Sequence, residues 1–71
     1  MSIDQVVMID KDIAGGVPVF RGTRVAVQTL FDHLEEDSLE EFLEGFPSVT
    51  RDQAEAVIEA AAHQFLSMVA A

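Results

Sequence analysis

Two helix-start signals on either side of a helix-stop signal constrain this chain more than any other feature. Ser38 and Thr50 can each supply the hydroxyl of a capping box, and the second member follows three residues later in both cases, as Glu41 and Gln53. Gly45-Phe46-Pro47 lies between the two boxes, and proline cannot continue a helix. We therefore predict a helix over residues 39–44, a turn, and a helix from about residue 51 to 69. Together they form a helix-turn-helix pair.

The ends of these two helices carry further expectations. A glycine after the last helical turn commonly adopts the left-handed conformation, so we expect Gly45 to be left-handed and Phe46 to fold back on the helix. The last helix has room for about 20 residues, roughly 30 Å, which exceeds what two short helices can cover. We predict that its end packs on a second copy of the chain, through Phe65, Leu66, Met68 and Val69.

The first half of the chain predicts one more helix and a hairpin. Val27, Leu30, Phe31 and Leu34 have the spacing of one helical face, which indicates a helix over residues 25–36. Before it, residues 5–9 and 17–20 are β-prone and apolar, and Gly15-Gly16 separates them as a turn. The predicted fold is mainly α, with three helices in a helix-turn-helix unit and a short N-terminal β-hairpin.

The chain has 71 residues, which we interpret as a single domain, 1–71. Residues 1–24 hold the hairpin and the turn after it, and residues 25–71 hold the helical unit. So small a domain is marginally stable alone, and without cysteine it has no disulfide to support it. This also favours a homodimer. No apolar run approaches the roughly 18 residues of a membrane span, and no signal peptide is evident, so we expect a cytoplasmic protein without membrane contact.

The charge balance limits the partners. The formal net charge is −9, with 13 acidic residues against 4 basic ones. Nucleic-acid affinity follows the number of phosphates that Lys and Arg neutralise, so general nucleic-acid binding by the lone chain is disfavoured. A basic protein surface suits this charge better. Six acidic residues gather across one helix junction: Glu35, Glu36, Asp37, Glu40, Glu41 and Glu44. We interpret this cluster as a solvated face or as a docking surface for a basic protein.

A helix-turn-helix also raises DNA binding, in which the first turn of its second helix contacts bases. Thr50, Arg51 and Gln53 stand in that turn and are the candidate DNA-binding residues. Asp52 and Glu55, however, would face phosphates. We therefore favour a helix-turn-helix that serves packing and assembly over one that binds DNA by itself.

The sequence Arg21-Gly22-Thr23-Arg24 is the only local concentration of positive charge, and two interpretations stay open. In the first, the arginines anchor an anion or a partner carboxylate by bidentate hydrogen bonds. In the second, Gly22 supplies an unusual backbone angle, Thr23 caps the next helix and the arginines pair with nearby acids.

The sequence shows no group of residues suited to catalysis or to metal binding. His33 with Glu36, and Glu59 with His63, have helical pair spacing, but two ligands do not make a usual metal site. We find no grouping of nucleophile, base and orienting residue. The sequence therefore predicts a protein that is not an enzyme, with no cofactor and no metal.

Two segments carry a family resemblance. Residues 16–27 read GVPVFRGTRVAV, and residues 38–43 and 46–50 read SLEEFL and FPSVT. Together they resemble the domain-of-unknown-function family four-three-three, which has a Gly-x-Pro-x-x-Arg-Gly-Thr-Arg box followed by a helix-turn-helix. The likeness spans about residues 9–61, and Arg21 to Arg24 match the box one by one. The chain departs from the pattern in two places: Ala26 replaces a proline, and Glu36-Asp37 replace a glycine.

The resemblance implies a homeodomain-like helix-turn-helix fold with an N-terminal β element, often dimeric. It also implies, for some members, a VapB-type antitoxin role beside a PIN-like ribonuclease toxin. Our hypothesis is a non-catalytic, antitoxin-like module that binds and inhibits such a toxin. The alternative is a helix-turn-helix transcriptional regulator that binds DNA alone or as a complex with its partner.

Overall fold

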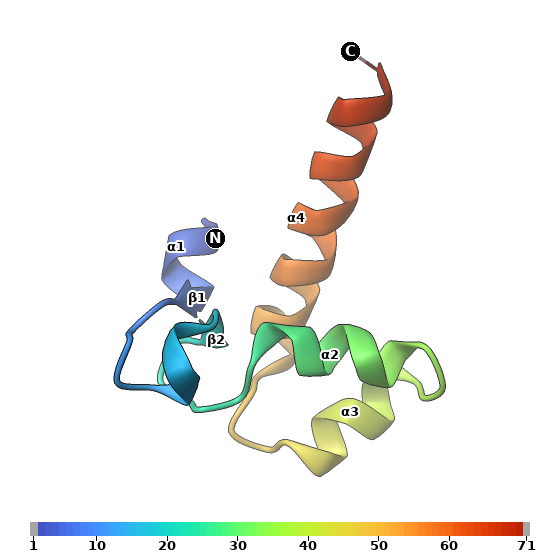
Figure 1. Ribbon diagram of the computed structural model, residues 1–71. Coiled ribbons are helices and arrows are strands. Elements are labelled where there is room, and N and C mark those ends of the chain that lie inside the picture. The colour runs from blue at the N-terminus through green and yellow to red at the C-terminus, as the bar shows by residue number, and fades with distance from the viewer. Residues whose placement is uncertain (1, 71) are drawn as a thin grey trace.

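The computed structural model describes residues 2–70, and within them four helices, one 3-10 turn and two short strands follow one another (Figure 1). The predicted mainly α fold with a short N-terminal β-hairpin is confirmed. No helix in this described part of the chain is both long and apolar enough to cross a lipid bilayer. The elements in order are α1 (Ile3–Val6), β1 (Val7–Met8), η1 (Ala14–Gly16), β2 (Val19–Phe20), α2 (Val27–Leu34), α3 (Leu39–Gly45) and α4 (Arg51–Ala70).

The hairpin pairs β1 with β2 in antiparallel register, Val7 opposite Phe20 and Met8 opposite Val19. Its first strand is shorter than predicted, because residues 3–6 form the helix α1 instead. The side-chain oxygen of Gln5 accepts a hydrogen bond from the Ser2 amide (2.9 Å), which closes a helical first turn. This local hydrogen bond competes with the strand pattern, and residues 5 and 6 were therefore wrongly predicted as strand.

Helix α2 begins at Val27, two residues later than predicted. The residues before it continue the sheet: the Phe20 amide donates to the Val25 carbonyl (3.0 Å), and Ala26 forms an isolated bridge with Val19. Backbone groups held in this way are not available for a first helical turn. The delay therefore follows from pairing with β2.

Helix α3 ends differently from the prediction. Gly45 is its last helical residue, and the positive-φ glycines of the described chain are Gly15, Gly16 and Gly22. The chain leaves the helix at Phe46 (φ −130°, ψ 70°), directly before Pro47. A residue before proline is disfavoured in the helical region, so the helix stops without a left-handed glycine. Phe46 does fold back as expected, with its ring centroid 5.0 Å from that of Phe42.

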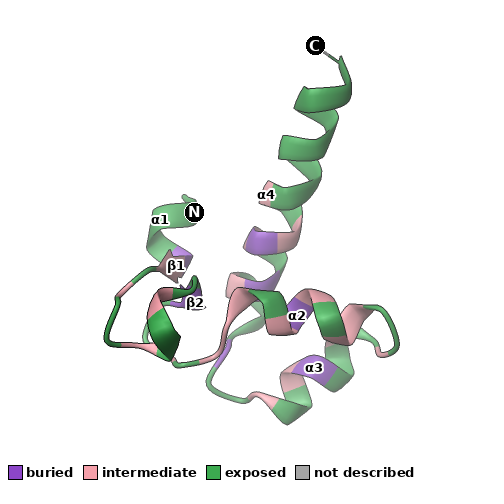
Figure 2. Ribbon diagram, viewed as in Figure 1, coloured by how far each residue is buried: buried purple, intermediate pink, exposed green. Residues whose placement is uncertain are grey.

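The core lies where α2, α3 and the first half of α4 meet the hairpin (Figure 2). Its largest buried side chains are Phe20, Phe42 and Leu30, and the rings of Phe20 and Phe42 lie 6.3 Å apart. Ala54 and Val57 bring α4 into this core. Beyond residue 60, α4 extends past the other elements, and all of residues 61–70 are exposed (Figures 1 and 2).

Candidate functional site: a candidate protein-binding surface

The Arg21-Gly22-Thr23-Arg24 box forms the tight turn that follows β2. Gly22 adopts φ +82°, a conformation that side chains other than hydrogen rarely allow. The Thr23 hydroxyl donates to the Phe20 carbonyl (2.8 Å) and accepts from the Val25 amide (3.0 Å). Thr23 therefore closes this turn, and the expected role as a cap of the next helix is wrong, since α2 begins four residues later at Val27.

Arg21 is held by backbone oxygens of the N-terminal segment. Its Nε and Nη2 donate to the Asp4 carbonyl at 3.1 and 2.8 Å, and Nη2 also reaches the Val7 carbonyl at 3.3 Å. A cation beside the free carbonyls at the end of a helix is favourable. Arg21 thus fastens α1 to the box through carbonyl oxygens, whereas the second of the two sequence interpretations expected acidic side chains as its partners.

Arg24 differs from Arg21 within the same box. Its side chain is exposed, and it forms no hydrogen bond or ion pair with the described residues 2–70. Its five guanidinium donors are therefore available to a carboxylate or another planar anion. Of the two arginines, Arg24 is the one that suits a partner-binding role.

Gln53 joins the box to the start of α4, although the two lie 32 positions apart in the chain. The side-chain oxygen of Gln53 accepts a hydrogen bond from the Thr50 backbone amide (3.0 Å), and the backbone amide of Gln53 donates to the Thr50 hydroxyl (3.1 Å). These two bonds complete the capping box that the sequence predicted. The side-chain nitrogen also donates to the Arg21 carbonyl (3.1 Å). Gln53 would have to give up these bonds to contact a base.

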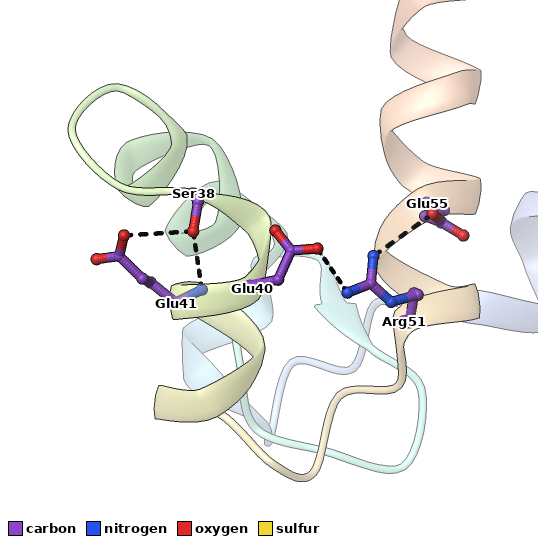
Figure 3. A network of polar contacts seen from close by, with 5 residues as sticks. All are labelled: Ser38, Glu40, Glu41, Arg51 and Glu55. Atoms are coloured by element: carbon purple, nitrogen blue, oxygen red, sulfur yellow. Dashed lines mark hydrogen bonds and ion pairs between the residues drawn. The ribbon is translucent and has the colours of Figure 1, made fainter.

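Arg51 lies between two carboxylates on the same surface (Figure 3). Its Nη2 is 2.7 Å from a Glu40 oxygen, and its Nη1 is 3.7 Å from a Glu55 oxygen. The hydrogen bond from Arg51 lowers the pKa of Glu40 below its ordinary range, and the same bond raises the pKa of Arg51. The positive charge of this DNA-binding candidate is therefore offset locally.

The cap of α3, formed by Ser38 and Glu41, is drawn on the other side of Glu40 from Arg51 in Figure 3, and it is only partly as predicted. The Ser38 hydroxyl accepts from the Glu41 amide (3.2 Å), as a capping residue does. The Glu41 carboxylate, however, accepts from that same hydroxyl (3.3 Å). The reciprocal half of the box is thus made to the side chain of Ser38.

A shallow groove of about 560 Å³ runs along α4 beside α1. Ile3, Ala56 and Ala60 give it an apolar surface. Three carboxylates and a histidine complete the lining: Asp52, Glu55, Glu59 and His63. The sequence interpretation missed this set as a surface. The signal was present in the spacing 52, 55, 59 and 63, which places all four on one side of a helix.

The histidines do not build a metal centre with the residues described. His33 pairs with Asp37 (3.2 Å) rather than with Glu36, and its ring packs edge-on against Phe46 at 5.3 Å. Among residues 2–70, no group of three or more His, Asp or Glu side chains is arranged to hold a metal ion.

Comparison with models of known protein families identifies the family of the chain. The family model described as "Protein of unknown function (DUF433)" matches residues 7–60. The chain belongs to this family. The match covers the hairpin, the box, α2, α3 and the inner half of α4, so the resemblance seen in the sequence is confirmed. No curated protein and no solved structure matches the chain significantly.

Proposed function

We propose that this DUF433 protein is a non-catalytic, antitoxin-like interaction module that binds and inhibits a PIN-type ribonuclease. The observation that carries the proposal is the groove between α1 and α4, an apolar surface bordered by Asp52, Glu55 and Glu59 on a chain of net charge −9. A ribonuclease needs a basic surface to hold RNA, because phosphate binding depends on Lys and Arg. An acidic helical surface complements that basic surface and steers the two proteins together.

Arg24 adds a second contact to this proposal. The catalytic centre of a PIN-type nuclease contains carboxylates that hold its metal ions. An exposed guanidinium that is free of partners within residues 2–70 can pair with such a carboxylate. In this arrangement the acidic groove covers the RNA path, and Arg24 occupies the carboxylates. Both contacts block the nuclease without any reaction by the antitoxin.

Co-expression with the neighbouring reading frame tests the proposal. We expect a nuclease encoded there to co-purify with this chain and to lose its toxicity. A Glu55→Gln/Glu59→Gln variant should bind at least tenfold more weakly. The matched control is Glu36→Gln/Glu44→Gln, which removes the same charge from exposed positions outside the groove. Absence of co-purification and of relief would overturn the proposal, and equal effects of both variants would exclude the groove.

The second candidate function is transcriptional regulation through a homeodomain-like helix-turn-helix. The arrangement that favours it is α3 followed by a five-residue turn, residues 46–50, and α4. The chain would bind DNA alone or as a complex with its partner, and because Arg51 is paired with Glu40 and Glu55, a basic partner that supplies phosphate contacts favours the complex. A mobility shift on its own promoter, with and without partner, discriminates the two functions. Shifting by the lone protein, abolished by Arg51→Ala, would favour regulation as the primary role.

A further inference from the structure

The outer half of α4, residues 61–70, presents an apolar stripe that the rest of the described chain does not cover. Its large side chains are mostly solvent-accessible, with Phe65 63% exposed and Met68 and Val69 each 68% exposed. These residues continue the face that Ala54 and Val57 bury in the core, because all share one side of the helix. The acidic groove lies on another side of α4, so the stripe is a separate surface.

We propose that this stripe is the self-association surface of the protein, which pairs with the same stripe of a second copy in antiparallel orientation. This surface is independent of the proposed nuclease-binding function. Helical segments of about ten residues are marginal in water unless tertiary contacts support them. A partner along the stripe supplies such contacts for residues 61–70.

The distribution of charge selects a second copy as the occupant. The chain carries net charge −9, yet residues 60–71 contain no Asp, Glu, Lys or Arg. Two copies repel each other over most of their surfaces, and this segment brings no like charges into contact. A basic partner, in contrast, gains nothing from an uncharged segment and is attracted to the acidic surfaces. The uncharged stripe is therefore suited to the chain itself.

The area of the stripe agrees with a weak dimer. Phe65, Met68 and Val69, the large side chains of the stripe, are each about two-thirds exposed. Pairing of two stripes therefore buries on the order of 800 Å² in total, below the size of stable specific interfaces. We expect a dissociation constant of roughly 1–100 μM, since interfaces of this size give weak association.

The position of the core determines the orientation. The inner half of α4 uses the same stripe to bury Ala54 and Val57 against its own α2 and α3 side of the molecule. In a parallel pair, the two globular bodies would occupy the same space between the helices. In an antiparallel pair, they lie at opposite ends of the contact, and only residues 61–70 of each copy overlap.

Sedimentation of the purified chain between about 5 and 500 μM tests the association. We expect a shift from 7.7 kDa to twice that mass. Dimerisation should strengthen as salt rises from 50 to 500 mM, because salt screens the repulsion between two acidic bodies. Binding to a basic nuclease should weaken over the same range, so the two proposals fail separately. A monomer throughout the concentration range would overturn this one.

Charge substitutions locate the surface. Phe65→Glu should weaken dimerisation at least tenfold, and Met68→Glu should do the same. Ser67→Glu is the matched control, because it places the same charge in the same segment on the side away from the stripe. All three positions are exposed in the monomer, and circular dichroism checks that the variants remain folded. Equal weakening by Ser67→Glu and Phe65→Glu would overturn the assignment.

Spin labels test the orientation, and the absence of native cysteine makes each label unique. In an antiparallel pair, the distance along the axis between equivalent labels grows by about 3 Å for each residue away from the centre of contact. A label at Ser67→Cys, on the side away from the stripe, should therefore be offset from its counterpart by only about 5 Å along the axis. A label at Glu59→Cys, also on the outer side, should be offset by about 20 Å, so the distance between the two labels should be longer by roughly 5 Å or more. Equal distances at both positions would show a parallel pair and overturn the arrangement.

Discussion

The two halves of α4 have similar apolar side chains at the same helical spacing but opposite environments. In the inner half, residues 51–60, Ala54 is fully buried and Val57 is 4% exposed. In the outer half, residues 61–70, Phe65 is 63% exposed. The family match ends at residue 60, and the burial of α4 against the rest of the described chain ends at the same residue. An apolar stripe therefore shows that something packs on a helix, but the same pattern fits a core and an interface.

The largest effect should separate a core phenylalanine from an exposed one. Phe42→Ala removes a ring that is fully buried against Phe20 and Phe46, and should lower the free energy of unfolding by about 3–5 kcal/mol. Phe65→Ala should change it by less than about 0.5 kcal/mol in dilute solution. Urea denaturation at low micromolar concentration measures both. A comparable loss in the two variants would mean that residues 61–70 belong to the folded body.

Substitutions at two glycines, Gly22 in the turn after β2 and Gly45 at the end of α3, should have the next largest effect on stability, because each changes the preferred backbone conformation. A methyl group at Gly22 or at Gly45 would meet no neighbouring atom within 4 Å, so each substitution by alanine tests conformation alone. Gly22→Ala should cost about 1–2 kcal/mol, since φ is +82°. Gly45→Ala should gain up to about 1 kcal/mol in the helix α3. Destabilisation by Gly45→Ala would instead indicate the left-handed ending that the sequence suggested.

The side chain that joins the box to α4 should have a smaller effect. Gln53→Ala removes the acceptor for the Thr50 amide and the donor to the Arg21 carbonyl. We expect a loss of about 1 kcal/mol, measured by thermal unfolding. Gln64→Ala is the control, because it truncates an exposed glutamine in the outer half of the same helix. If the two variants had equal melting temperatures, the hydrogen bonds of Gln53 would contribute nothing to the stability of the fold.

The smallest effect concerns the exposed pair of Glu40 and Arg51. The hydrogen bond from Arg51 lowers the pKa of Glu40 from its ordinary value of 4.5. The stabilisation of the folded state by this pair is therefore present above pH 4.5, and it is lost as the pH falls through the lowered pKa of Glu40. Melting temperatures between pH 7 and pH 3 measure this loss. The difference between wild type and Glu40→Gln should shrink over that range, whereas Glu44→Gln, an exposed residue of the same helix, should show no such change.

Much of the local structure was determined by the sequence alone. The capping residues Ser38 and Thr50, the stop at Pro47 and the spacing of Leu30 with Phe31 and Leu34 predicted α2, α3 and α4 with boundaries within about two residues. These signals act over a single helical turn, through hydrogen bonds and steric contacts between near neighbours. The family followed in the same way, from the Arg-Gly-Thr-Arg box and the Phe-Pro turn.

The tertiary structure decided what these elements do to one another. The sequence interpretation could not tell that Arg21 binds the carbonyls of α1, that Gln53 reaches the box, or that Arg51 is offset by Glu40. Each of these contacts joins residues 11 or more positions apart, and their geometry depends on how the helices pack. For the same reason, periodicity identified the stripe on α4 as apolar, but only the packed body showed where its burial ends.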